Sequence, residues 1–366
     1  MRVLITNPFL VQRSGTETYV VDLACELQRR GHLPVIYVKK AGPLAGELRD
    51  RDIPVITRLA QLPFVPDIIH GHGHEVTLKA LAECSNVPGL FICHNHRHWI
   101  DTTPIHPRIL RYFGVSELCV ARLLNEGAPV TRTETLLNWV DTKRFLQRDP
   151  LPKVPKRALI FSNYASDETH LPAVRLACSR ANLTLDVIGL GVGKPAANPE
   201  VVLTQYDLVF AKAKAAMEAM AVGAAVVLCD FAGVGPMVTP ENFEYLQKLN
   251  FGFQALDQPL CAESLLPQIA AYDVYRAGQV TRKIRQTASL EQRVDQLIDI
   301  YTGILADFQA GDANPAPVDT GYRLRQVRSI AKQKTVDLWF ALPMSLRRRI
   351  KSNRHLQRLI KANFPG

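Results

Sequence analysis

The segment that most constrains the fold spans residues 206–230, where apolar runs, two lysines and a glycine follow one another in a fixed order. Leu208 to Phe210 is an apolar run of strand length, and residues 215–221 are good helix formers. Gly223 stands where a glycine ends a helix, and residues 225–228 form a second buried strand. This order of strand, basic turn, short helix and strand predicts an α/β fold.

Charged side chains lie where the helix of this segment is expected to begin. Lys212 and Lys214 flank the helix start, and Glu218 lies about one turn further on. A helix N-terminus beside two lysines attracts anions, and a nearby carboxylate suits the vicinal hydroxyls of a ribose. The segment therefore predicts a nucleotide-diphosphate site. An ordinary buried α/β helix with solvated lysines is the alternative.

The N-terminus carries a similar unit. Residues 3–6 form an apolar strand, and the helix that follows runs to Arg30 with an apolar stripe at helical spacing. Ser14 and Glu17 have the spacing of a capping box. Gly15 lets a ligand approach the backbone, with the amide of Thr16 behind it, so both are candidate phosphate-binding residues. A plain strand-to-helix turn is the alternative.

Polar side chains follow three further strands, expected at residues 67–70, 90–94 and 112–116. Ligands of open α/β sheets bind beyond the carboxyl ends of the strands, which makes His72 and His94 candidates. His94 is followed by His96 and Arg97. Alternating histidines can bind zinc, but no matching Cys, Asp or Glu set accompanies them, so we expect no metal.

Two Pro-rich stretches, residues 148–157 and 312–319, divide the chain. We expect one domain over residues 1–150, a second over 151–310, and a tail over 311–366. The strands expected in the second domain are residues 158–162, 184–188, 201–203, 208–210 and 225–228, with helices at 172–181 and near 281–308.

Composition fits a two-domain cytoplasmic protein. The chain has 366 residues, 47% of them hydrophobic and 21% charged, and no apolar run reaches the roughly 18 residues of a membrane span. Its seven cysteines contain no Cys-x-x-Cys pair. Cys25, Cys93, Cys119 and Cys229 lie in apolar contexts, so we expect reduced, buried thiols.

The basic charge is concentrated in the tail. Residues 321–366 hold twelve Lys or Arg and one acidic residue, Asp337, so the rest of this +10 chain sums to −1. Apolar residues lie among the tail arginines, which favours peripheral contact with an anionic membrane at the inner face. Packing across the domains is the alternative. Nucleic acid is not expected as a partner.

Several of these residues resemble one known family. Residues 218–227, Glu-Ala-Met-Ala-Val-Gly-Ala-Ala-Val-Val, are similar to the donor-binding helix of GT-B glycosyltransferases of retaining family 4. The resemblance continues in Ser-Gly-Thr-Glu at 14–17, Arg-Gly-His at 30–32, and the Asn-Trp-Val-Asp run that begins at Asn138.

This resemblance implies two Rossmann-like domains facing a central cleft, and a nucleotide-diphosphate sugar as donor. The acceptor would be a glycan or a lipid-linked precursor in cell-surface polysaccharide or glycolipid synthesis. Transfer would be of the hexosyl type (EC 2.4), retaining, and independent of metals and cofactors. Taken together, the resemblance and the residues themselves give these candidates: for catalysis, His94 and Glu218; for the donor, Gly15, Thr16, Ser162, Asn163, Gly189, Lys212, Lys214, Glu218 and Ala219; and for the acceptor, His72, His96 and Arg97.

The sequence departs from the family pattern at several points, three of which lie at candidate site positions. Phe210 stands where the first glutamate of the pattern is expected, and Ser14 replaces a glycine. Ser162-Asn163 replaces the Gly-Arg that clamps the diphosphate, a role that Lys212 and Lys214 could take over. A non-catalytic GT-B binding protein and a nucleotide-sugar epimerase are therefore alternatives.

Overall fold

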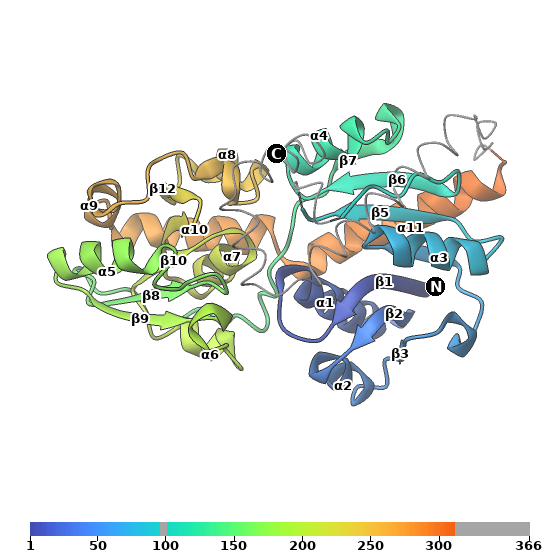
Figure 1. The fold of residues 1–366 in the computed structure, drawn as a ribbon, viewed down its shortest axis with the longest axis horizontal. Coiled ribbons are helices and arrows are strands. Elements are labelled where there is room, and N and C mark those ends of the chain that lie inside the picture. Colours follow the sequence, from blue (N-terminus) through green and yellow to red (C-terminus); the bar gives the residue numbers. More distant parts are fainter. Residues whose placement is uncertain (96–100, 312–366) are drawn as a thin grey trace, which may run out of the picture. The chain divides into compact units, whose positions relative to one another are not determined.

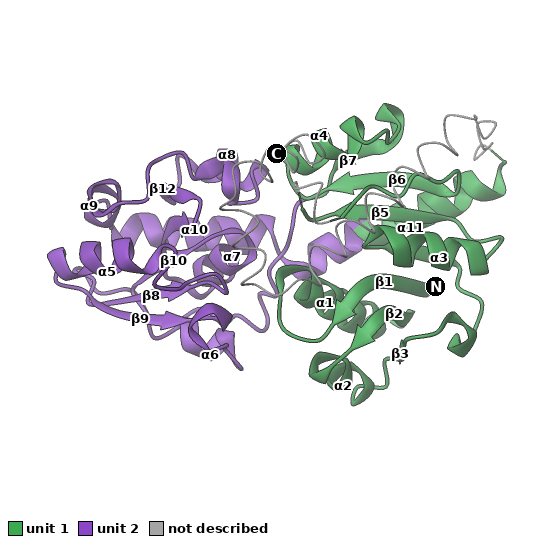
Figure 2. Ribbon diagram, in the orientation of Figure 1, with its two compact units in different colours: residues 1–136, 297–366 green, residues 137–296 purple. Residues whose placement is uncertain are grey.

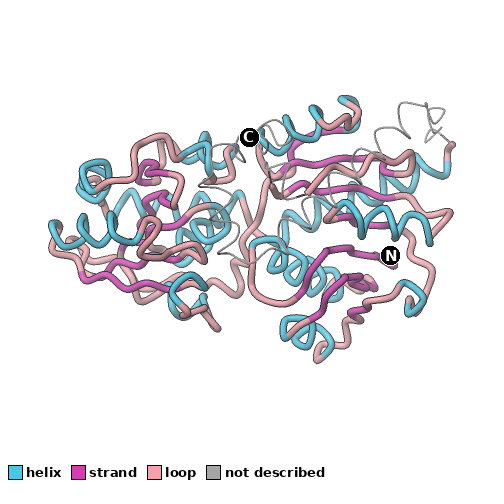
Figure 3. Tube along the Cα trace, in the orientation of Figure 1, coloured by secondary structure: helices cyan, strands magenta, loops and turns pink. Residues whose placement is uncertain are grey.

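The computed structural model describes residues 1–95 and 101–311. The chain divides into two compact units (Figure 2). Unit 1 comprises Met1–Leu136 and the described residues from Leu297 onward, and unit 2 comprises Leu137–Gln296. Helices and strands alternate along both units (Figure 3), as expected of an α/β protein.

Unit 1 is built on a seven-stranded parallel sheet (Figure 1) with the order β3-β2-β1-β4-β5-β6-β7. Its strands are β1 (Arg2–Leu10), β2 (Leu33–Ala41), β3 (Val55–Ile56), β4 (Ile68–Gly71), β5 (Gly89–Cys93), β6 (Ile109–Gly114) and β7 (Thr133–Thr135). Its helices are α1 (Gly15–Arg29), α2 (Pro43–Arg49), α3 (His74–Glu83), α4 (Glu117–Asn125) and the later part of α11 (Leu290–Gln309), with short 3-10 turns η1 (Leu59–Gln61) and η2 (Val130–Arg132).

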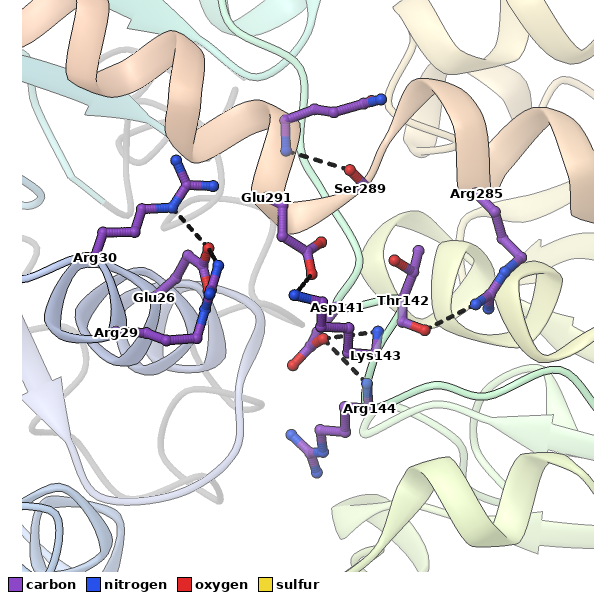
Figure 4. Close-up of polar contacts among 11 residues, drawn as sticks. Glu26, Arg29, Arg30, Asp141, Thr142, Lys143, Arg144, Arg285, Ser289 and Glu291 are labelled. Carbon is purple, nitrogen blue, oxygen red and sulfur yellow. Dashed lines mark hydrogen bonds and ion pairs between the residues drawn. The ribbon is translucent and has the colours of Figure 1, made fainter.

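Helix α1 shows how the sequence pattern becomes structure. Its apolar stripe is fully buried, and near its C-terminus Glu26 accepts hydrogen bonds from Arg29 and Arg30 (Figure 4). Ser14 is the N-cap, as predicted. Its side chain makes no capping hydrogen bond, so the predicted capping box is wrong. The carboxylate of Glu17 accepts from the amides of Val11 and Gln12, because the loop before the helix folds back over its first turn.

Unit 2 holds a five-stranded sheet with the order β12-β11-β10-β8-β9, parallel except for β12. Its strands are β8 (Arg157–Phe161), β9 (Thr184–Ile188), β10 (Leu208–Ala211), β11 (Ala225–Asp230) and β12 (Gly233–Met237). Its helices are α5 (Leu171–Arg180), α6 (Pro199–Leu203), α7 (Ala213–Val222), α8 (Phe243–Lys248), α9 (Ala262–Ala270), α10 (Val274–Thr287) and the start of α11, with 3-10 turns η3 (Leu190–Val192) and η4 (Phe253–Ala255).

Two expectations for unit 2 are corrected. Residues 201–203, expected as a strand, belong to helix α6, whose first residue is Pro199. Proline fixes a helical φ and needs no amide partner at that position, so it favours a helix start over a strand. Strand β12 was not expected, because its Gly-Val-Gly-Pro sequence has a low strand propensity.

The boundary between the units lies before the Pro-rich linker at residues 148–157. Val140 and Phe145 pack in the core of unit 2, and the Val140 amide donates to the Ala288 carbonyl at 2.8 Å. Two further contacts fix the next residues of this segment: Arg285 donates to the Thr142 carbonyl, and Lys143 forms an ion pair with Glu291 (Figure 4). These contacts explain why residues 137–150 belong to unit 2.

Candidate functional site

The sheet of unit 1 reverses its strand order between β1 and β4, and such switch points are where open α/β sheets bind ligands. A cavity of about 360 Å³ lies at the carboxyl ends of these strands. Asn7 in the second half of β1, His72 after β4, and His94 after β5 all line it, together with Thr16 from the first turn of α1.

Histidine and tyrosine rings stack beside this cavity. The ring centroid of His72 lies 4.7 Å from that of His70 and 4.9 Å from that of His94. Tyr19 on α1 covers His94, with centroids 4.5 Å apart. On the inner side, His70 Nδ1 lies 2.6 Å from the hydroxyl of Tyr301 on α11. We call Tyr19, His70, His72, His94 and Tyr301 the histidine stack.

Burial keeps the inner imidazoles of the histidine stack uncharged. It lowers the pKa of His70 to about 3, with a smaller contribution from His94. It also lowers the pKa of His72 well below the usual value, and the neighbouring His70 and His94 act in the same direction. At neutral pH a neutral imidazole can donate one hydrogen bond to a hydroxyl group and accept one from it, but it offers no positive charge to an anion.

The cationic side chains at the cavity are paired. Lys39 lies 2.7 Å from Glu75. The Arg122 guanidinium donates to the carbonyls of Asn95 and Asp101 and lies 3.3 Å from the Glu126 carboxylate. A cavity with neutral imidazoles and compensated charges favours an uncharged polyhydroxyl ligand over a phosphate.

Three of the predicted residues of unit 1, Thr16, His72 and His94, therefore meet at one cavity. Gly15 begins α1, and a methyl group placed on it would contact nothing within 4 Å. His96 and Arg97 lie outside the described residues. Tyr19 and Tyr301 were missed, because nothing in their local sequence distinguishes them from core tyrosines.

The sheet of unit 2 also has a switch point, between β8 and β10. Ser162 and Asn163 follow β8, and the Asn163 side chain accepts from the amide of Leu190 at 3.2 Å. Gly189 packs so closely on them that an added Cβ would lie 1.9 Å from the Ser162 carbonyl oxygen. These three predicted residues thus lie together at the carboxyl edge of the sheet.

Lys212 lies at the same edge, as the N-cap of α7. Its ammonium is 2.9 Å from the carboxylate of Asp230, the last residue of β11. The ring centroids of Phe253 and Tyr164 lie 4.5 and 5.1 Å from the same nitrogen. The lysine side chain is 15% exposed, so it reaches solvent while held by a buried anion.

A second buried group faces the same carboxylate. His170, the N-cap of α5, has its Nδ1 atom 3.8 Å from Asp230 Oδ1, and neither side chain is exposed. Burial lowers the pKa of His170, partly offset by Asp230. Sequence reasoning missed both residues. Asp230 could have been found as the polar end of an apolar strand, but no local signal identifies His170.

The other predicted residues of unit 2 lie on helix α7. Glu218 is 7% exposed, and Lys214 donates to the Trp139 carbonyl at 3.3 Å. Ala219 is fully buried in the core and presents no side-chain surface to a ligand.

Among the residues that the structure describes, no group of three or more His, Cys, Asp or Glu is arranged to bind a metal ion. No helix within residues 1–95 and 101–311 combines the length and the apolar character needed to cross a bilayer.

The fold is shared with known glycosyltransferases, although no protein-family model and no curated protein sequence matches the chain. A glycosyltransferase from Rickettsia africae ESF-5 superposes with a TM-score of 0.59 at 15% identity, over 83% of this chain and 98% of that one. Anabaena Alr3699/HepE, solved in complex with UDP and glucose, gives 0.58 at 14% identity, over 82% and 99%. Sucrose-phosphate synthase from Thermosynechococcus elongatus gives 0.52 at 12% identity, over 83% and 99%. The chain therefore has the GT-B fold.

Proposed function

We propose that this protein is a glycosyltransferase that moves a sugar from a nucleotide-diphosphate sugar to a glycan or lipid-linked acceptor. The observation that carries the proposal is the pairing of a GT-B fold with polar side chains at both of its sheet switch points. Membership of retaining family 4, hexosyl specificity and independence of metals are parts of the same proposal.

The donor is assigned to unit 2. Asn163, Gly189 and Lys212 line the edge where β8 and β10 end, and Glu218 lies on the helix that follows. Uridine is the first base to test, because the HepE structure holds UDP and glucose. In this role the Glu218 carboxylate binds the ribose hydroxyls, and Lys212 or Lys214 neutralises the diphosphate.

The acceptor is assigned to the cavity of unit 1. Its volume of about 360 Å³ lies at the small end of ligand pockets, enough for a sugar ring. His94 is the proposed catalytic residue there, since an imidazole can hydrogen-bond a sugar hydroxyl and stabilise charge as the glycosidic bond loosens. Residues 321–366 are proposed to contact an anionic membrane at the cytoplasmic face, which would bring lipid-linked acceptors close.

A binding protein without transferase activity is the second candidate. The observation in its favour is the ion pair between Lys212 and Asp230, which already neutralises one of the two lysines assigned to the diphosphate.

The experiment is a thermal-shift screen with UDP, GDP, ADP, CMP and their sugar conjugates, followed by an assay of nucleotide release. A ligand that binds only the folded protein raises its Tm. We expect one nucleoside diphosphate to raise the Tm, and Glu218→Ala to abolish that shift. His94→Ala should retain the shift but release nucleotide at least a hundredfold more slowly. Binding without any release, with or without acceptor glycans, would select the binding protein, and no shift with any ligand would reject both.

A further inference from the structure

The buried side chains behind Lys212 suggest how this lysine could be held and then released. Asp230 is fully buried and carries the only carboxylate that the described structure places within ion-pair distance of Lys212. His170 stands on the other side of the same carboxylate, at a distance too long for a hydrogen bond. Within the described residues, neither ring nitrogen of His170 has a hydrogen-bond partner.

Burying the His170 ring without hydrogen-bond partners lowers the stability of the folded protein. A buried imidazole without partners loses its hydrogen bonds to water and gains none from the protein. Protonation would place a positive charge beside Asp230, and Nδ1–H could then donate a charge-assisted hydrogen bond to Asp230 Oδ1 after a shift of about 1 Å. Lys212 opposes that protonation while its positive charge stays on the same carboxylate.

We propose that Asp230 binds Lys212 in the free protein, and that protonated His170 replaces Lys212 on this carboxylate when the donor binds. When the diphosphate of the donor binds at the edge of the second sheet, the Lys212 ammonium moves to a phosphate oxygen, and His170 takes one proton from solvent to pair with Asp230. The inference rests on the proposed function, since it needs a diphosphate at this edge. It makes Asp230 and His170 positioning residues for the donor site.

The surroundings of His170 leave few other sources of charge. Asp230 from β11 and Lys212 before α7 act on it directly. In the loop before α5, Asp167 pairs with Arg175 at 3.3 Å on the exposed surface, and Glu168 is exposed. Where α9 packs on α5, the exposed pair Arg180–Glu263 is also compensated. These outer groups face solvent, so the charge on His170 depends mainly on where Lys212 lies.

Proton uptake on binding fixes the direction of the pH dependence. If the bound state holds one more proton than the free state, donor affinity rises as pH falls, by up to about tenfold per pH unit. The movement of Lys212 also retains charge balance, since a positive charge leaves Asp230 as another arrives. Without proton uptake, the buried Asp230 carboxylate would keep only the hydrogen bond from the Phe231 amide and would face no positive charge, which is strongly unfavourable.

Isothermal titration with UDP-glucose at pH 6 and pH 7, in two buffers of different ionisation enthalpy, tests the proposal. UDP-glucose is chosen because its diphosphate is a diester and does not titrate in this range, unlike the terminal phosphate of UDP. We expect the wild type to take up between half a proton and one proton on binding. His170→Gln should bind with no proton uptake and with an affinity that does not change between pH 6 and pH 7.

A second variant and a control complete the titration experiment. If His170→Gln does not fold, Asp230→Asn replaces it, and the same loss of proton uptake is expected because Lys212 then has no anion to leave. His32→Gln in unit 1 is the matched control and should retain the wild-type uptake. Binding with no proton uptake in the wild type, or with equal uptake in His170→Gln, overturns the inference and leaves the proposed function standing. Absence of binding to UDP-, GDP- and ADP-glucose alike would reject the proposed donor site, and the inference with it.

Discussion

The sheets of the two units each have a switch point, but the side chains at the two edges differ in charge. At the edge of unit 1, polar groups are neutral rings or paired charges around a cavity. At the edge of unit 2, a formal charge is buried beside a partly exposed lysine. Neutral rings suit hydroxyl groups, whereas a charge pair that can be rearranged suits phosphates. An α/β switch point can therefore be specialised for either ligand class by the residues that end its strands.

The largest effect is expected where the edge of unit 2 is packed most tightly. Gly189→Ala should destabilise unit 2 by about 4 kcal/mol, because its φ is +154° and its new Cβ would lie 1.9 Å from the Ser162 oxygen. Urea unfolding measures the loss. Gly193→Ala is the control for backbone strain alone, since its φ is +69° with open space around the Cβ, and should cost about 1 kcal/mol. Equal losses in the two variants would mean that the loop yields to the clash.

Acid should weaken unit 1 more than unit 2. The folded-state pKa of His70 is about 3 and that of the unfolded chain about 6.5, so the unfolded chain binds more protons between these values. The contribution of His70 is therefore fully present above pH 6.5 and falls by about 2 kcal/mol at pH 5. His72 acts in the same direction. In unit 2, only His170 is a buried histidine within the described residues.

Amide hydrogen exchange at pH 7 and pH 5, corrected for intrinsic exchange rates, checks this prediction in strands β4 and β10. Protection in β4 should decrease more than in β10. An equal decrease in both strands would contradict the assignment of acid sensitivity to the histidine stack.

A smaller effect is expected at the inner end of the histidine stack. Tyr301→Phe removes the hydroxyl group 2.6 Å from His70 Nδ1 and leaves that nitrogen buried without a partner. The free energy of unfolding should fall by about 1.5 kcal/mol, with nucleotide binding unchanged. Calorimetry measures the change, and Tyr245→Phe, at a residue that is 65% exposed, is the control. A loss no larger than that of the control would show that the bond contributes nothing to stability.

The smallest effect on stability is expected at Gly15. Gly15→Ala meets no neighbouring atom and improves helix propensity, so the protein should gain a few tenths of a kcal/mol. If Gly15 also serves for close approach of a ligand, the same variant should lower donor affinity severalfold. A stable variant with unchanged affinity would remove Gly15 from the proposed site.

Much of the fold could be predicted from the sequence, because most strands are short apolar runs and helix ends are marked by particular residues. The strands at residues 184–188 and 225–228 and the helix ending at Gly223 were predictable from apolar runs and one glycine. Helix α6 was not, because the three-residue apolar run at 201–203 fits a strand as well as it fits a short helix that begins at Pro199. Strand β12 depends on pairing with β11, which no local pattern contains.

The candidate site was predictable only in part, for a related reason. Thr16, His72 and His94 were identified because each follows a strand or opens a helix, and the structure places all three at one cavity. Asp230 and His170 are 60 positions apart in the sequence and are brought together only by the folded sheet, so no local pattern could pair them. Whether any of these residues acts in catalysis stays a prediction until the variants are measured.

Helix α11 has a consequence for the order in which the protein is made. Unit 2 is one continuous stretch of chain, whereas unit 1 needs the residues from Leu297 onward, including Tyr301 beside His70. During synthesis from the N-terminus, the first 136 residues must wait for α11, while the later unit can already complete its core. We therefore expect the ribosome-bound chain to fold its second half first, and truncations before Leu297 to spare that half alone.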